Sequence, residues 1–183
     1  QWHANGNLFE ESHWNEHGLT GVHKTWHVNG QLLAESTLDE EGHTHGSKRS
    51  WHENGQLESD ADYEHGSLSE RFRAWHENGK LRIESTGCKD DRCEKTTNWT
   101  GDGTKSSEDL VELEGDCNTR TLWHANGKQA YLRRHCDYEL ESYSCWDEAG
   151  KKADNCQAIH DSIAKTGDYL AQSALRRVAD LVG

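Results

Sequence analysis

Histidine is the residue type in this sequence with the clearest potential for metal chemistry, and the chain contains 13 of them. Five of these follow a tryptophan in a recurring motif: His3, His27, His52, His76 and His124. If one copy of the motif spans two strands of a sheet, successive copies lie about 9.5 Å apart. Zinc needs ligand atoms about 2.0–2.1 Å from the ion, so these histidines cannot share one metal. The spacing predicts a packing or surface ladder of histidines.

A closer pair, His43 and His45, lies in a segment that we expect to be a loop, but no partner ligand is evident beside it. We therefore expect no metal site. Carboxylates are abundant but recur with the motif, and the sequence contains no nucleophile–base arrangement, phosphate loop or cofactor fingerprint. The sequence predicts no catalytic residues, no cofactor and no enzymatic activity.

The recurring motif divides most of the chain into seven units of about 24 residues. Clear copies read WHANGNL, WHVNGQL, WHENGQL, WHENGKL and WHANGKQ, and worn copies read WTGDGTK and WDEAGKK. The units begin at Trp2, Trp26, Trp51, Trp75, Trp99, Trp123 and Trp146. A constant period of this length is typical of a repeat architecture.

Each unit has the pattern of two strands and two turns. Asn-Gly after an alternating stretch is a strong hairpin signal, and a second glycine follows the tryptophan by about sixteen residues, as at Gly18 and Gly66. Small or apolar residues alternate with polar ones between them, as in the segment 57–63. We expect a mainly β fold, an extended single-sheet antiparallel meander of seven repeats, with one buried face per strand.

Two geometries of the repeat turn are compatible with the sequence. A two-residue Asn-Gly turn would place His76 opposite Leu81, whereas a three-residue Glu-Asn-Gly turn with a bulge would place Trp75 opposite Leu81. We favour the bulged turn, with tryptophan and leucine both packed inward, although the sequence leaves both geometries open.

The six cysteines predict three disulfides in an oxidising compartment. Counting outward from the Asn126-Gly127 turn places Cys117 opposite Cys136. Cys88 and Cys93 flank a predicted turn, and Cys145 and Cys156 lie near each other across Ala149-Gly150. The expected pairs are Cys88–Cys93, Cys117–Cys136 and Cys145–Cys156. A chain that starts at Gln1 and lacks Met is expected to have lost a secretory signal, which predicts a periplasmic or extracellular protein.

The C-terminal segment differs in pattern from the repeats. Apolar residues recur at helical spacing from Ile159 to Leu181, so we divide the chain into a repeat domain, 1–156, and a C-terminal helix, 157–183. The helix is expected to cap the open edge of the sheet. The alternative is a helix that binds a partner.

Composition narrows the classes of partner. Among 183 residues, 33 are acidic and 20 are basic, which gives a net charge of −13. This balance excludes a basic surface for nucleic acid, since binding to phosphates requires clustered Lys and Arg. No apolar stretch approaches the roughly 20 residues of a transmembrane span.

The string WHENGQL…YEHGSL…WHENGKL resembles the bacterial MORN-variant repeat, with a similarity that covers about residues 2–152. The chain departs from the common pattern in having His where a second aromatic residue is usual, and in its cysteines. The resemblance implies an antiparallel β-ribbon that binds proteins. It also implies an antitoxin or immunity protein that neutralises a secreted toxic effector, such as one delivered by type VI secretion.

We therefore expect an exported immunity protein that binds a basic effector, for instance a lipase or phospholipase, and blocks its active site. A lipid anchor on the missing N-terminus would be compatible with this function. The candidate partner-binding residues are Trp26, His27, Trp51, His52, Glu53, Asp60, Asp62, Glu64, Trp75, His76 and Glu77. Among them, the acidic residues Glu53, Asp60, Asp62, Glu64 and Glu77 are expected to be exposed. The alternatives are an envelope-associated scaffold, a glycan-binding ribbon, or charges that only keep an open sheet soluble.

Overall fold

The computed structural model describes residues 1–87, 93–112, 116–137, 139–157, 159 and 161. The chain divides into two compact units, Gln1–Thr86 (unit 1) and Gly87–Gly183 (unit 2). The strands of unit 1 are β1 (Glu10–Asn15), β2 (Gly18–Trp26), β3 (Leu32–Leu38), β4 (Thr44–Trp51), β5 (Leu57–Glu64), β6 (Ser67–Trp75) and β7 (Leu81–Gly87). The strands of unit 2 are β8 (Cys93–Trp99), β9 (Lys105–Glu112), β10 (Cys117–Trp123), β11 (Gln129–Cys136) and β12 (Glu139–Cys145).

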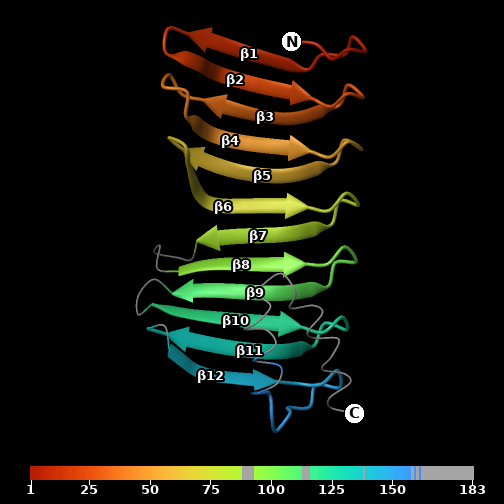
Figure 1. The fold of residues 1–183 in the computed structure, drawn as a ribbon, viewed down its shortest axis with the longest axis vertical. Helices are drawn as coiled ribbons and strands as arrows, with labels where there is room; N and C mark the ends of the chain where they lie inside the picture. Colours follow the sequence, from red (N-terminus) through yellow and green to blue (C-terminus); the bar gives the residue numbers. More distant parts are fainter. Residues whose placement is uncertain (88–92, 113–115, 138, 158, 160, 162–183) are drawn as a thin grey trace. The chain divides into compact units, whose positions relative to one another are not determined.

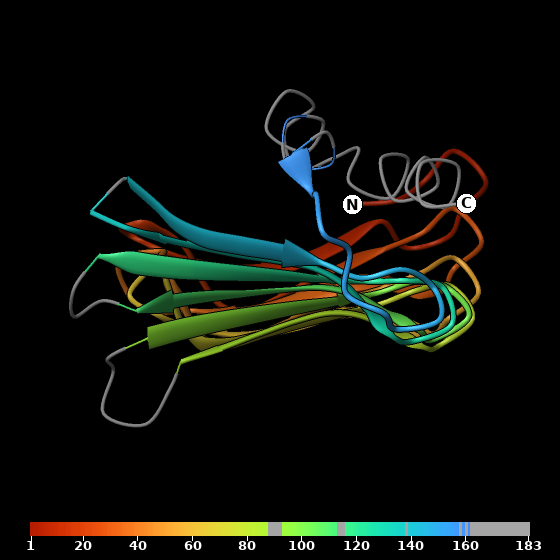
Figure 2. The same ribbon diagram turned by 90° about the horizontal axis from the view of Figure 1, so that it is seen from below.

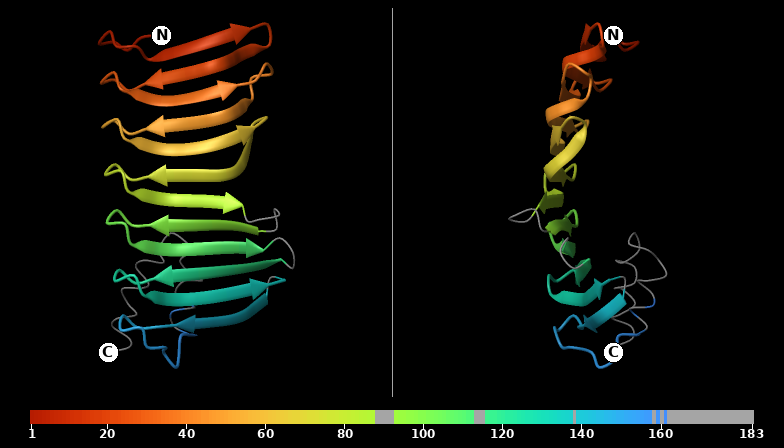
Figure 3. Two further views of the ribbon diagram at one scale, coloured as in Figure 1. Left: turned by 180° about the vertical axis from the view of Figure 1, so that it is seen from behind. Right: turned by 90° about the vertical axis from the view of Figure 1, so that its left-hand side faces the viewer.

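In each unit every strand pairs antiparallel with the next one along the chain, from β1 to β7 and from β8 to β12 (Figure 1). Seen edge-on, β1–β7 form one layer of strands (Figure 3). The turns between β2 and β3, β4 and β5, and β6 and β7 lie along one side of unit 1, which we call the repeat-turn edge (Figure 1). The turns between β3 and β4 and between β5 and β6 lie along the other side, the connecting-turn edge. The predicted antiparallel meander is confirmed.

The repeat turns share one hydrogen-bonding pattern. At the turn between β4 and β5, the His52 amide donates to Gln56 O at 2.9 Å and the Gly55 amide donates to His52 O at 2.8 Å. Gly55 has φ of +81°, a conformation that favours glycine. Trp51 lies opposite Leu57, with an irregularity in register beside it. Of the two geometries that the sequence allowed, the bulged three-residue turn is therefore the one that forms.

Burial in unit 1 does not follow the one-face pattern that we expected. In β5 the adjacent residues Asp60 and Ala61, which point to opposite faces, are 5% and 4% exposed. The prediction of one buried face is therefore wrong for this strand. In a single layer, the longer side chains of the two neighbouring strands can bury a central side chain. They can do so on either face of the sheet.

Unit 2 contains a compact apolar cluster. It is built from Leu122, Tyr131, Cys145, Cys156 and Ile159. Burial raises the pKa of the Tyr131 hydroxyl to about 12. The segment after β12, drawn in blue, leaves the plane of the strands (Figure 2). The segment then folds back toward the end of β12, where the Ala153 amide donates to Cys145 O at 2.9 Å. It thereby provides the second layer against which the apolar cluster packs.

Two of the three predicted disulfides are confirmed, Cys117–Cys136 and Cys145–Cys156, with Cα–Cα distances of 4.1 and 5.8 Å. The first joins residues that lie directly opposite each other on β10 and β11. Cys88, of the predicted pair Cys88–Cys93, lies outside the described residues, as does nearly all of the predicted helix 157–183. Two disulfides fit an exported protein of an oxidising compartment. No helix in the described part of the chain has the length and apolar character to cross a membrane.

We predict that the double substitution Cys117→Ser and Cys136→Ser lowers the free energy of unfolding of unit 2. The disulfide closes a loop with a sequence separation of 19, for which the chain-entropy model gives roughly 3 kcal/mol. Urea denaturation of the full chain, followed by Trp fluorescence and circular dichroism, measures the change. An unchanged midpoint for every transition would show that the crosslink contributes nothing to stability.

Candidate functional site

The motif histidines connect successive repeats through what we call the histidine bridges. A carbonyl oxygen only accepts hydrogen bonds, so Nε2 of each bridging imidazole carries a proton and donates it. His27 Nε2 donates to Trp51 O at 2.8 Å, and His52 Nε2 donates to Trp75 O at 3.0 Å. His3 and His124 make the same bond to Trp26 O and Trp146 O, at 2.9 and 2.7 Å. The tryptophan carbonyl at the end of one strand is thereby satisfied by the preceding repeat.

The motif asparagines add a second connection between neighbouring turns. Asn54 Oδ1 accepts from the Gln56 amide at 3.0 Å within its own turn, while its Nδ2 donates to Glu77 O of the next turn at 2.7 Å. Asn29 Nδ2 makes the equivalent bond to Glu53 O at 2.8 Å. The Trp-His-x-Asn-Gly motif is thus explained by hydrogen bonds that hold the turns in a row.

These bonds change the role of several predicted partner-binding residues. His27 and His52 direct their Nε2 donors into the sheet, and His76 is also engaged in an interaction within the chain. Trp26, Trp51 and Trp75 are all half-buried. The Arg73 guanidinium lies over the Trp75 ring, 5.5 Å from its centroid, which is a cation–π contact. These aromatic residues are consequently part of the framework of the repeat.

A row of charges of alternating sign crosses the middle of unit 1. The pairing register places these residues side by side on one face: Lys24, Glu35, Arg49, Asp60, Arg73 and Glu84. Lys24 Nζ lies 2.9 Å from a Glu35 oxygen. Opposite charges on directly paired strands stabilise a sheet, so we regard this charged row as structural. The sequence contains a pattern that could have predicted this row, because charges of alternating sign occupy equivalent positions of successive strands. Our sequence-based prediction did not include it.

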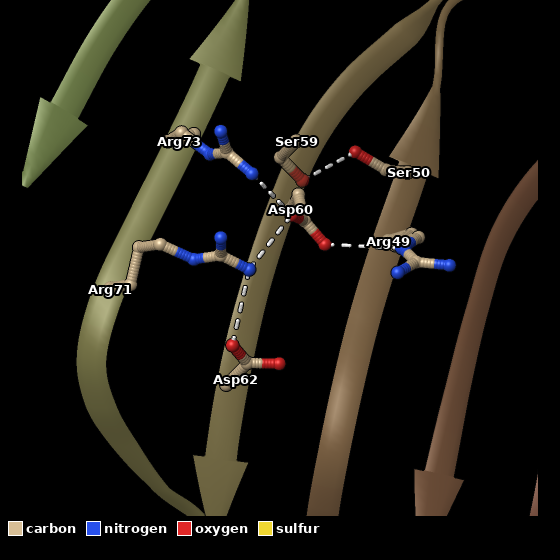
Figure 4. Close-up of polar contacts among 7 residues, drawn as sticks. All are labelled: Arg49, Ser50, Ser59, Asp60, Asp62, Arg71 and Arg73. Atoms are coloured by element: carbon tan, nitrogen blue, oxygen red, sulfur yellow. Dashed lines mark hydrogen bonds and ion pairs between the residues drawn. The ribbon is translucent and has the colours of Figure 1, made fainter.

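Asp60 lies at the centre of the charged row (Figure 4). Its carboxylate pairs with Arg49 Nε at 3.1 Å, Arg73 Nη2 at 3.3 Å and Arg71 Nη2 at 3.4 Å, and Arg71 also pairs with Asp62 at 3.3 Å. Desolvation tends to raise the pKa of the Asp60 carboxyl, but the hydrogen bonds and charges of the arginines outweigh it, and the net pKa is lowered. The expectation that Asp60 is exposed is wrong, because three arginines cover it.

The predicted acidic residues that are exposed do not form one site. Glu53 and Glu77 occupy equivalent positions on the repeat-turn edge, and the same position in the preceding turn is Val28, which is 62% exposed. Glu64 lies on the opposite, connecting-turn edge. The connecting-turn edge also carries a group that the sequence did not reveal, in which ligand atoms of Asp39, His45 and His65 lie within 4.8 Å of one another.

We predict that His52→Ala lowers the free energy of unfolding by about 1–2 kcal/mol, because the half-buried Trp75 carbonyl loses its imidazole donor. The matched control is His17→Ala, since the His17 side chain is 66% exposed and should change stability by less than about 0.5 kcal/mol. Urea denaturation of both variants measures the difference. Equal effects of the two substitutions would contradict the structural role of the bridge.

We predict that Asp60→Asn destabilises the fold by about 1–3 kcal/mol at neutral pH. The effect stays below that of a fully buried pair because the Arg49 and Arg73 side chains are 48% and 32% exposed. A lowered folded-state pKa gives stability that is present above the unfolded pKa of about 3.9 and is lost as pH falls through the folded pKa. The difference from wild type should therefore shrink below about pH 4.

Denaturation of wild type, Asp60→Asn and Asp62→Asn across pH 3–7 tests this prediction. The Asp62 side chain is 45% exposed, so its variant should differ little from wild type at any pH. A difference between wild type and Asp60→Asn that is as large at pH 3 as at pH 7 would rule out the ionic origin of the effect.

Comparison with known proteins supports the repeat type. Residues 44–65, which include β4 and β5, match the family model described as MORN repeat variant. No curated protein sequence matches the chain. Among solved structures, part of the GtfA/B complex bound to UDP and GlcNAc is similar at 14% identity, over 71% of this chain and 24% of that chain, with a TM-score of 0.28. This chain thus spans about a quarter of that one, and we draw nothing further from so distant a likeness. The chain contains MORN-type repeats.

Proposed function

We propose that this chain is a protein-binding repeat of the immunity type, which binds a basic toxic effector and blocks its active site. The observation that supports the proposal is the way in which the charges of unit 1 are distributed. Four of the seven basic side chains of unit 1 are bonded to carboxylates on the sheet, whereas exposed carboxylates such as Glu16, Glu53 and Glu77 stand at the turns. The negative field of the unit is therefore strongest along its edges.

The charge count makes this imbalance concrete. Residues 1–86 contain 15 acidic and 7 basic side chains. Of the basic ones, Lys24, Arg49, Arg71 and Arg73 form ion pairs within the sheet. These pairs neutralise the middle of the face and leave the acidic excess to the exposed positions. A basic partner would be attracted to the edges more than to the face.

The repeat-turn edge is the better candidate of the two edges for a partner surface. Its turns are held by the histidine bridges and by asparagine amides, so little conformational entropy would be lost when they are bound. Val28, Glu53 and Glu77 occupy the same turn position at intervals of two strands, roughly 9.5 Å each. This combination offers one apolar contact and two carboxylates in a fixed row.

The proposal includes an oxidising location. Two disulfides fit an exported protein. We propose the periplasm or the cell exterior, where an immunity protein meets an effector that acts on the envelope, such as a lipase or phospholipase. A lipid anchor on a segment preceding Gln1 would hold the chain at the membrane surface.

We predict that the double reversal Glu53→Lys and Glu77→Lys weakens binding of the effector encoded beside this chain by about tenfold or more, through a lower association rate. Calorimetry or surface plasmon resonance with the purified effector measures the affinity, and protection of cells that express the effector measures neutralisation. Wild-type affinity should also fall as salt rises.

The matched control is Glu16→Lys, which reverses a charge at the turn between β1 and β2, where the Glu16 side chain is 87% exposed. It should leave the affinity within about twofold of wild type. Equal loss in both variants would remove the repeat-turn edge from the proposal. If the adjacent gene encodes no toxin, or its product does not bind, the immunity function fails and an envelope scaffold becomes the better account.

A further inference from the structure

The connecting-turn edge of unit 1 brings metal-binding side chains together from two separate turns. Asp39 lies after β3, His45 lies in β4, and His65 lies in the turn between β5 and β6. One ligand atom from each of the three residues lies within 4.8 Å of the others. We propose that Asp39, His45 and His65 bind a divalent transition-metal ion of the zinc class. This inference is independent of any protein partner.

The Asp39 carboxylate is already oriented for such a role. Its side chain is only 13% exposed. Oδ1 accepts from the backbone amides of His43 and Glu41 at 2.8 and 3.1 Å, and Oδ2 accepts from His65 Nδ1 at 2.9 Å. Outer hydrogen bonds of this kind fix the direction of a ligating carboxylate. A metal ion would replace the proton that His65 shares with Asp39, since a ligating nitrogen must offer its lone pair.

The position of His65 in its turn is unusual for a histidine. His65 and Gly66 have φ of +45° and +83°, and Glu64 pairs with Ser67, so the two form the loop of a tight hairpin. Such loops favour Asn, Asp or Gly, because a side chain at positive φ is strained. Here the strained conformation places the imidazole against Asp39.

The second imidazole is held close by a bond between the turn and β4. The Gly66 amide donates to Thr44 O at 2.8 Å, which fixes the turn against the start of β4. The rings of His45 and His65 have centroids 4.8 Å apart and are tilted by 49°, so they are not stacked in parallel. Their nitrogens can therefore converge on one point beside the Asp39 carboxylate.

The donor set determines the class of metal. Two imidazoles and one carboxylate suit zinc and its transition-metal neighbours, whereas calcium and magnesium prefer ligands that are all oxygen. In a tetrahedral zinc site the ligand atoms lie roughly 3.4 Å apart, so atoms within 4.8 Å of one another need only a small closure. The exposed His65 side chain can supply that movement by rotation. Glu41 and His43, which form a second group with Asp39, lie beside it and offer a fourth ligand.

The experiment titrates ZnCl₂ into the full chain by calorimetry, and repeats the titration with Co²⁺ to read the coordination from its absorption spectrum. We expect His65→Asn to lower zinc affinity at least tenfold, since asparagine tolerates positive φ and keeps the turn. His45→Gln, on a strand, is a second ligand deletion that leaves both turns unchanged and should have the same effect. Zinc should raise the Tm of wild type more than that of either variant.

The matched control is His17→Asn, because His17 occupies the same Glu-His-Gly sequence in the turn between β1 and β2 and is similarly exposed. It should bind zinc within twofold of wild type and show the same rise in Tm. The proposal is overturned if wild type binds zinc no more tightly than His65→Asn and His45→Gln, or if His17→Asn loses as much affinity as they do.

Discussion

The hydrogen bond from a motif imidazole to the tryptophan carbonyl of the next repeat is the interaction on which unit 1 depends. A single layer of strands has no interior in which side chains from two sheets can interlock, so it cannot be stabilised mainly by apolar burial. Its stability must come from contacts between adjacent strands and adjacent turns. His27 and His52 provide such contacts at intervals of one repeat, and the asparagine amides reinforce them. The motif recurs in the copies that begin at Trp2, Trp26, Trp51 and Trp123 because the histidine of each of these copies bonds to the tryptophan carbonyl of the next one.

The same constraint determines where the charges lie. With no core to exclude them, charged side chains occupy the middle of the sheet and pair across strands, as Asp60 does with three arginines. In unit 1 that pairing involves four of the seven basic residues, and exposed carboxylates stand at the turns. The single-layer architecture of unit 1 thus determines which of its carboxylates are paired and which are exposed. The middle of the face is neutralised, and the repeat-turn edge that we propose as the partner surface presents Glu53 and Glu77, with Lys80 in the same turn as Glu77.

Much of the fold could be predicted from the sequence, because the constant repeat length allows the pairing of residues on adjacent strands to be counted from the turns. The period located the turns, and counting from Asn126-Gly127 placed Cys117 opposite Cys136. The candidate site was harder to predict. The alternation of polar and apolar residues shows which face of the sheet a side chain lies on, but it does not show which neighbouring side chains bury it. Asp60 appeared exposed for this reason. His65 was separated from its partner Asp39 by 26 residues, and only the pairing of β3, β4 and β5 brings their turns together.

The most direct measurement of the histidine bridges is the exchange of their imidazole protons with water, followed by nuclear magnetic resonance of the ¹⁵N-labelled chain. Nε2 of His27 and His52 should carry a proton that exchanges slowly, because it is donated to a half-buried carbonyl. The exposed His17 ring should exchange too fast to be seen. Rapid exchange at His27 and His52, or a neutral tautomer protonated at Nδ1, would contradict the account of how the repeats are held together.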